Sequence, residues 1–272
     1  MKKSFFNEIG RIVNDSGEQS AAIEKKIDKK LISILLFIPF SLTMIYYLGH
    51  YTFLRTILLN LGADTIAGYT DRWVRGSFSN NLGQLTYWVG TLVLFYFIIP
   101  VVMIKFFFKE NLTDYGLKIK GAFKGYYLYI IMLLIMIPLV LYFSTTAAFQ
   151  AKYPFLKIKE GDAFSDLVKW ELLYCVQFFV LEFFFRGFMV FGLRPQLGVY
   201  SVFVMTIPYC MIHFGKPLPE TLAAIIAGVI LGFLSLKNRS IWLGFLIHCS
   251  VGVGMDMAAL WQKGMLRELF FN

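Results

Sequence analysis

Charged residues are scarce in this chain of 272 amino acids. Asp, Glu, Lys and Arg make up only 16% of the residues, whereas 58% are hydrophobic and the mean hydropathy is +0.64. Ordinary soluble domains carry about 25% charged residues, so this composition excludes a soluble globular protein. The sequence therefore predicts a polytopic membrane protein.

Cysteine is also rare, and Cys175, Cys210 and Cys249 all lie within apolar segments. No C-x-x-C spacing pairs them, which argues against a disulfide framework, and we interpret them as small core residues. The first 30 residues lack the apolar run and small-residue cleavage site of a secretory signal peptide. The net charge of +9 comes from basic residues that flank the apolar segments, so it suits an anionic membrane surface rather than nucleic acid.

Apolar runs of about 17 to 25 residues mark the predicted membrane spans. The expected spans are Leu31 to Leu48, Leu85 to Phe108, Tyr126 to Phe143, Trp170 to Leu193, Val199 to His213, Thr221 to Leu236 and Ile241 to Trp261. Tyr51 to Leu61 is a candidate for an eighth, shorter or re-entrant piece. The fold class is all-α, because an open sheet cannot pair its edges in lipid.

Lysines and arginines in short loops predict the orientation. The stretch "EKKIDKK" before the first span and the five lysines between Lys105 and Lys124 favour the cytoplasmic side, so the N-terminus is predicted to be cytoplasmic. The loop from Thr145 to Lys169 breaks this pattern, because it is predicted outside and yet carries four lysines. Residues 1–30 form a separate N-terminal segment in which Phe5, Phe6, Ile9 and Ile12 share a helical face, as in an amphipathic surface helix or a flexible tail.

Few ionisable side chains lie within the predicted spans, and each costs about 2.5 to 3.5 kcal/mol to insert, so each is expected to face a partner inside the bundle. Glu182 and Arg186 in "VLEFFFRGFMVFGL" are four residues apart and can pair on one helix face. The pair is either a structural ion pair or a carboxylate whose charge the arginine controls. Gly187 next to it allows a neighbouring segment to approach.

Two histidines and one further acid complete this set. His213 follows Pro208 at the end of its span, and His248 and Asp256 share the last span on adjacent faces. A carboxylate with two histidines can bind a divalent metal such as zinc, with Glu182, His213 and His248 as ligands, or can activate water directly. The predicted spans place Glu182, His213 and His248 at different depths in the membrane. The spans therefore do not predict that these three side chains meet in one site. Asp256 is expected to be a packing partner of Arg186 or a site residue.

Small residues at Ala224, Gly228 and Gly232 recur every four positions in "LAAIIAGVILG". This stripe predicts a face on which another helix packs closely.

The segment from about Trp170 to Trp261 resembles the CPBP intramembrane proteases, which include CAAX-prenyl-processing, bacteriocin-processing and Abi-type members. "LEFFFRGF" is similar to the family's glutamate-pair and arginine motif, "YCMIH" to its aromatic and histidine motif, and "HCSVG" to its His-x-x-x-Asn motif. The resemblance implies a protease-like core at about 165–262 within a membrane domain of residues 31–272. It implies that His213 assists a glutamate base and that His248 polarises the scissile carbonyl.

The sequence departs from that family pattern at two positions. Leu181 stands where the family has the glutamate that acts as general base, and Gly252 stands where it has Asn. Tyr209 replaces the phenylalanine before His213, a milder change. If catalysis is retained, Glu182 takes over as the base and Ser250 or Asp256 supplies the role of the Asn.

Three functions are therefore open from the sequence. The first is an intramembrane endopeptidase that cleaves a membrane-associated or lipidated CAAX-like protein, in a bacterial cytoplasmic membrane. The second is a catalytically degenerate member of the same family that acts as a membrane binding or immunity protein. The third is a small transporter with an intramembrane proton relay, although no inverted repeat supports it.

Overall fold

Helices account for all of the regular structure that the computed structural model describes, which covers residues 28–76, 80–158 and 164–266. The prediction of an all-α protein is confirmed. The predicted amphipathic face of Phe5, Phe6, Ile9 and Ile12 lies outside the described residues.

The helices of the first half include one long composite span. They are α2 (Lys29–Leu48), α3 (Tyr51–Asn60), α4 (Asp64–Gly76), then the continuous run of α5 (Leu82–Leu92), the π-helix η1 (Val93–Ile98), α6 (Ile99–Val102) and the π-helix η2 (Met103–Phe108), followed by the 3-10 turn η3 (Leu112–Tyr115), α7 (Tyr126–Ser144) and α8 (Ala147–Lys152).

The helices of the second half begin with another composite span. They are the continuous run of α9 (Phe164–Glu182), the π-helix η4 (Phe183–Phe191) and α10 (Gly192–Leu197), followed by α11 (Tyr200–Met211), α12 (Leu218–Asn238) and α13 (Trp242–Gln262).

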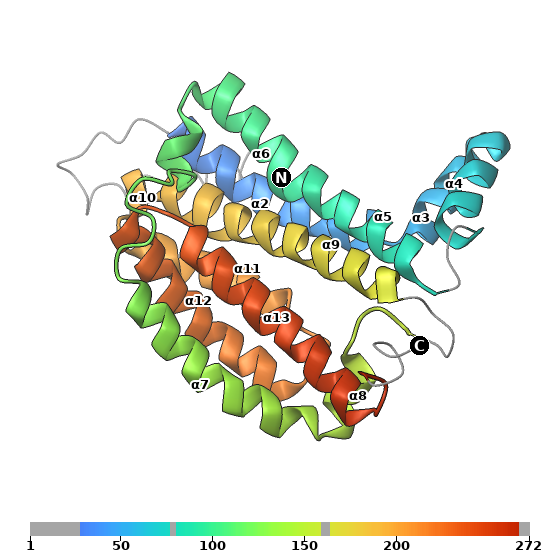
Figure 1. The fold of residues 1–272 in the computed structure, drawn as a ribbon. Coiled ribbons are helices and arrows are strands. Elements are labelled where there is room, and N and C mark those ends of the chain that lie inside the picture. The colour runs from blue at the N-terminus through green and yellow to red at the C-terminus, as the bar shows by residue number, and fades with distance from the viewer. Residues whose placement is uncertain (1–27, 77–79, 159–163, 267–272) are drawn as a thin grey trace, which may run out of the picture.

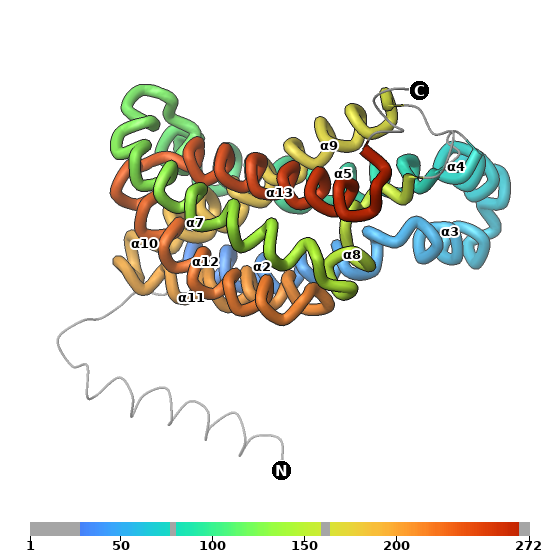
Figure 2. Tube along the Cα trace, turned by 60° about the horizontal axis from the view of Figure 1, so that its bottom comes forward, coloured from blue at the N-terminus to red at the C-terminus, as the bar shows by residue number. Residues whose placement is uncertain are grey.

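Six of these helical runs in the described residues are long and apolar enough to cross a membrane. They coincide with six of the seven predicted spans, and the chain is an integral membrane protein. The seventh, α11, has only 12 residues. The candidate eighth piece forms α3, whose ten residues extend about 15 Å and fall short of the roughly 30 Å hydrocarbon core. Figures 1 and 2 show α3 and α4 projecting together from one end of the bundle.

Contacts between loops define two ends of the bundle. At the first end, Lys30 before the first span pairs with Glu110 after the second at 2.6 Å, and Ile241 donates its backbone N–H to the carbonyl of Gly116 at 3.1 Å. Burial raises the pKa of Glu110, but its hydrogen bonds from Lys30 and Tyr115 outweigh this effect and the net pKa is lowered. Segments predicted to share one side of the membrane therefore do share one end of the bundle.

The second end gathers the remaining loops. Asn81 before α5 donates to the carbonyl of Phe155 at 3.0 Å, and Lys263 after α13 donates to the carbonyl of Tyr153 at 2.7 Å. The lysine-containing loop from Thr145 onward thus lies at this end. Since α11 leads from the first end and α12 returns to it, α11 acts as a shortened seventh pass, in agreement with about seven spans.

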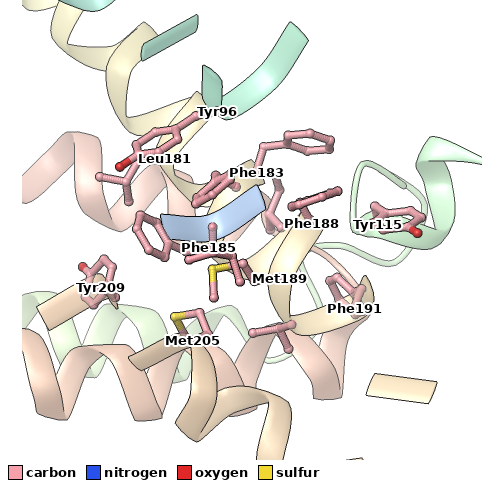
Figure 3. Packing of buried hydrophobic residues seen from close by; sticks show 14 of the residues in the cluster. Tyr96, Tyr115, Leu181, Phe183, Phe185, Phe188, Met189, Phe191, Met205 and Tyr209 are labelled. Atoms are coloured by element: carbon pink, nitrogen blue, oxygen red, sulfur yellow. The ribbon is translucent and has the colours of Figure 1, made fainter. Parts of the chain in front are cut away.

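The composite helix Phe164–Leu197 is the centre of the bundle. In the most apolar 18-residue stretch of this helix, 83% of the residues are buried. In the corresponding stretch of α7 only 11% are buried, because α7 presents its apolar surface to lipid. In Figure 1 the composite helix lies between α2, α5 and α6 on one side and α13, α12 and α7 on the other. Phe183, Phe184 and Phe185 of η4 are fully buried, and Tyr96 stacks on Phe184 with ring centroids 4.4 Å apart. Figure 3 shows the surrounding aromatic cluster. A charged side chain in the middle of this helix is therefore removed from both water and lipid.

Close helix packing uses the predicted small-residue stripe. A Cβ atom added at Gly232 would lie 2.6 Å from Cγ1 of Val202 on α11, and one added at Gly228 would lie 3.1 Å from the ring of Tyr209. The stripe is thus the face on which α11 packs. Gly187 allows a different approach, because its Cβ would lie 2.8 Å from the backbone oxygen of Tyr115. The contacts at Gly228 and Gly232 hold α11, and with it Tyr209, against α12.

We predict that Gly232→Ala destabilises the protein by about 1 to 3 kcal/mol, because the added methyl group overpacks the α11–α12 contact. The measurement is thermal unfolding in detergent. The matched control is Gly90→Ala, where an added Cβ meets no atom within 4 Å and the helix gains propensity. Equal unfolding temperatures for the two variants would contradict the packing argument.

Candidate functional site

Glu182 lies at the centre of the bundle and is paired with two cationic or ionisable side chains. Its Oε1 atom lies 2.9 Å from Nη1 of Arg186 and 2.6 Å from Nδ1 of His248. Glu182 and Arg186 are fully buried, whereas the side chain of His248 remains 17% exposed. The carboxylate therefore depends on one partner from its own helix and one from α13.

Local structure explains how α13 approaches so closely. Gly244 lies on α13 one turn before His248, and a Cβ atom there would be only 2.5 Å from Oε2 of Glu182. The π-helix η4 begins directly after Glu182, and such wider turns often occur at functional sites. Trp242 at the start of α13 packs on Phe179, with ring centroids 5.7 Å apart. The absent side chain at position 244 is what lets Glu182 contact the last helix.

Tyr209 connects α11 to this pair. Its hydroxyl group lies 2.9 Å from Nε2 of His248, and its ring lies under the guanidinium of Arg186 at 4.1 Å. The ring of His213 contacts Tyr209 with centroids 4.9 Å apart, and its Nδ1 donates to the carbonyl of Tyr209 at 2.8 Å. Tyr209 thus has contacts with Arg186, His248 and His213 at once.

The prediction that the site residues lie at different depths was wrong. The structure brings Glu182, His248 and Tyr209 into direct contact, with His213 adjacent to Tyr209. The prediction assumed full-length spans of equal reach. Because α11 ends after only 12 residues, the chain beyond it stays near the level of the site.

Two of the predicted supporting residues lie apart from this cluster. Ser250 is exposed and donates its hydroxyl to the carbonyl of Leu246 on its own helix at 2.9 Å. Asp256 is fully buried and accepts a hydrogen bond from Nε1 of Trp170 at 2.7 Å. Asp256 therefore packs against Trp170 rather than Arg186.

Both departures from the family pattern have a structural counterpart. Leu181 is 6% exposed and belongs to the same apolar cluster as Tyr96, as Figure 3 shows. At Gly252, an added Cβ would lie 2.3 Å from Cε2 of Phe178. The Phe178 ring stacks on His248, with centroids 5.6 Å apart and planes inclined by 7°. An aromatic ring from α9 thus fills the space that a side chain at position 252 would enter.

Phe178 and Gly244 are site residues that the sequence analysis did not identify. Phe178 lies one helical turn before Glu182, so its position on the face of the acid was a usable signal. The contact of Gly244 with the carboxylate depends on the distance between two helices, which the local sequence does not specify.

The residues present do not fit the predicted metal site. Within the described ranges, no three His, Cys, Asp or Glu side chains form a group that could hold a metal ion. Nδ1 of His213 is engaged by the carbonyl of Tyr209, which leaves its Nε2 available, but the two nitrogens of His248 already face Glu182 and Tyr209. A three-ligand site needs one nitrogen of each histidine and an oxygen of Glu182 to point at one shared position, and the contacts of His248 do not leave it such a nitrogen.

The comparison with known families falls on this half of the bundle. Residues 163–253 match the family model described as type II CAAX prenyl endopeptidase Rce1-like. The matched range contains Glu182, Arg186, Tyr209, His213 and His248. The match confirms the resemblance to CPBP intramembrane proteases and supports, at the level of the family, a membrane-embedded hydrolase. Neither the search of curated proteins nor the search of solved structures gives a match.

We predict that Gly252→Asn destabilises the protein by about 1 to 3 kcal/mol, because its side chain collides with the Phe178 ring. The double variant Phe178→Ala, Gly252→Asn should regain stability relative to Phe178→Ala alone, since the amide then has space. Thermal unfolding in detergent measures both effects. The control is Gly254→Asn, where an added Cβ meets no atom within 4 Å; a loss as large in this control would refute the steric explanation.

Arg186→Met should lower the free energy of unfolding by about 3 to 5 kcal/mol, because it leaves the buried Glu182 carboxylate without its arginine. Adding Glu182→Gln to this variant should restore part of the loss. Chemical unfolding of the four proteins of this double-mutant cycle measures the coupling. Arg194→Met, at an exposed arginine on α10 of the same composite helix, serves as the control; strict additivity of the two core changes would argue against a coupled pair.

Proposed function

We propose that the protein is an intramembrane endopeptidase that hydrolyses a peptide bond in a membrane-associated or lipidated, CAAX-like substrate. The observation that carries the proposal is the 2.6 Å contact between Glu182 and Nδ1 of His248 in a buried site. A carboxylate that holds one nitrogen of an imidazole leaves the other to exchange a proton. The family match supports the choice of peptide hydrolysis as the reaction.

The exposure of the two side chains distinguishes the role of Glu182 from that of His248. Glu182 is fully buried, and its Oε2 atom is covered by the backbone of α13 at Gly244. The side chain of His248 is 17% exposed, and its Nε2 faces Tyr209. We therefore assign proton transfer from water to His248, with Glu182 as a positioning residue. This assignment differs from the role of base that the family resemblance implies for a glutamate.

His248 carries out both proton transfers, and the neighbouring residues assist it. His248 accepts a proton from water as the water oxygen attacks the carbonyl carbon, and the Tyr209 hydroxyl donates to the developing oxyanion. When the carbon–nitrogen bond breaks, His248 returns the proton to the leaving amine, so that one water is consumed. Glu182 stabilises the imidazolium in between, and Arg186 holds both Glu182 and the ring of Tyr209. His213 positions Tyr209 through its 4.9 Å ring contact.

A second function rests on the two departures from the family pattern. Leu181 places an apolar side chain at the family's base position, and the Phe178 ring fills the space beside Gly252. A family member with these changes that binds a peptide or lipidated chain without cleaving it would serve as a membrane binding or immunity protein. In that case Glu182, Arg186 and His248 form a structural network.

We predict that the protein, reconstituted in lipid, cleaves members of a library of prenylated and unprenylated peptides, and that Glu182→Gln lowers the rate by about 10² to 10⁴-fold. His248→Gln should cost a similar factor. The double variant should lose little more, since residues that act as one unit are non-additive in their effects. Product formation is measured by mass spectrometry, with and without a chelator.

The matched control is Glu171→Gln, the same substitution on α9 at a partly buried acid three turns from the site. It should leave the rate within a few fold, with folding of every variant checked by thermal unfolding. Products that persist in Glu182→Gln would overturn the assigned roles. An absence of products from every folded form would favour the non-catalytic function, and loss of activity on chelation would contradict a metal-free site.

A further inference from the structure

A cavity of about 530 Å³ lies at the second end of the bundle. It opens to the surface and is lined by residues at the start of α5, in the segment that follows α8 and at the end of α13. His248 lies twelve residues before Leu260, which lines the cavity, so the two sites are about 18 Å apart along α13. The cavity is therefore separate from the proposed catalytic site.

Three lysines make the wall of this cavity basic. Lys152, Lys157 and Lys263 line it, and none of its described lining residues is acidic. Within the described residues, no ion pair involves any of these three lysines. Lys216, beside the smaller neighbouring cavity that also includes Lys152, is neutralised by Glu220 at 2.6 Å. The larger cavity thus carries positive charge that no ion pair among the described residues neutralises, although the buried Asp256 acts on Lys263 at longer range.

The position of each lysine is constrained by a neighbouring group. Nζ of Lys263 donates to the carbonyl of Tyr153 at 2.7 Å, and Nζ of Lys152 lies 5.6 Å from the ring centroid of Phe155. Partial burial lowers the pKa of Lys263, and the charge of Asp256 opposes this effect only in part. Both contacts leave further ammonium N–H groups for a ligand.

Asn81 fixes the segment that bears Lys157. Its side-chain nitrogen donates to the carbonyl of Phe155 at 3.0 Å, and its side-chain oxygen accepts the backbone N–H of Lys157 at 2.7 Å. The ring of Phe155 packs edge-on against Trp170, with centroids 6.1 Å apart. The cavity wall is therefore held by hydrogen bonds and core packing on both sides.

The cavity lies at the boundary of the membrane-spanning helices. Asn81 immediately precedes α5, and Lys263 immediately follows α13. The wall also includes apolar side chains, among them Leu85, Phe155 and Leu260. A ligand that suits this surface has an anionic group next to an apolar portion, and it is present where the hydrocarbon region ends.

We propose that this cavity binds the phosphate group of an anionic phospholipid. Basic cavities at the ends of membrane helices favour anionic headgroups, and lysine ammonium groups donate to phosphate oxygens in charge-assisted hydrogen bonds. The site also accounts for the lysine-containing loop after Thr145, which departs from the charge rule for orientation. Lys152 and Lys157 of that loop then bind lipid phosphate at their own end of the bundle, and their positions do not indicate the cytoplasmic side.

The test is the thermal stability of the full chain in neutral detergent, titrated with short-chain phosphatidylglycerol, with short-chain phosphatidylcholine and with inorganic phosphate. Phosphatidylglycerol should raise the unfolding temperature saturably, and the neutral lipid should not. In the variant Lys152→Gln, Lys157→Gln, Lys263→Gln the apparent affinity for phosphatidylglycerol should fall about tenfold or more. Native mass spectrometry of the same samples counts the bound lipids.

The matched control removes three exposed lysines at the first end of the bundle, as Lys118→Gln, Lys120→Gln, Lys124→Gln. It should keep the affinity of the unaltered protein. Equal loss in both triple variants would overturn the site in favour of general charge attraction, and a response to inorganic phosphate as strong as that to the lipid would assign the cavity to free phosphate. Because no catalytic assay is involved, the result is independent of peptidase activity.

Discussion

The burial of the Glu182 carboxylate is the constraint on which the rest of the structure depends. A carboxylate enclosed by aromatic side chains loses its hydration, and several kcal/mol must be offset by nearby positive charge and hydrogen bonds. Arg186 supplies one partner at 2.9 Å from the next turn of the same helix. His248 supplies the other at 2.6 Å and requires α13 to pack against the centre of the bundle. Gly244 is the adaptation that permits this approach, because any side chain there would collide with the carboxylate.

The two departures from the family pattern lie on opposite sides of this buried acid. At Leu181 an apolar side chain extends the aromatic core, so one acid remains where the family has two. At Gly252 the missing side chain is matched by Phe178, whose ring stacks on His248 with planes inclined by only 7°. The glycine at position 252 and the Phe178 ring are thus sterically linked, because any side chain at this position would collide with the ring. This arrangement leaves His248 with a carboxylate at one nitrogen, a hydroxyl at the other and a ring along its face.

Parts of this arrangement could be predicted because they depend on residues close in sequence. The span limits followed from apolar runs, the Glu182–Arg186 pair from four-residue spacing, and the α11 contact from the stripe at Gly228 and Gly232. The depth argument failed because it treated every span as a full crossing, whereas α11 is short. The expected proximity of Asp256 to Arg186 failed for a related reason, since the face of a helix that meets a given neighbour depends on how the two helices are rotated.

The sequence by itself determined that this protein is helical and lies in a membrane, because each residue's preference for lipid or water adds along the chain. It also determined which side chains are costly to insert and must find partners. Only the tertiary structure decided which partners they find. The contacts from Glu182 to His248, from Tyr209 to His248 and from Phe178 to position 252 each join helices distant in sequence. Their geometry depends on helix length, rotation and close approach at glycines, which emerge only when all the helices pack together.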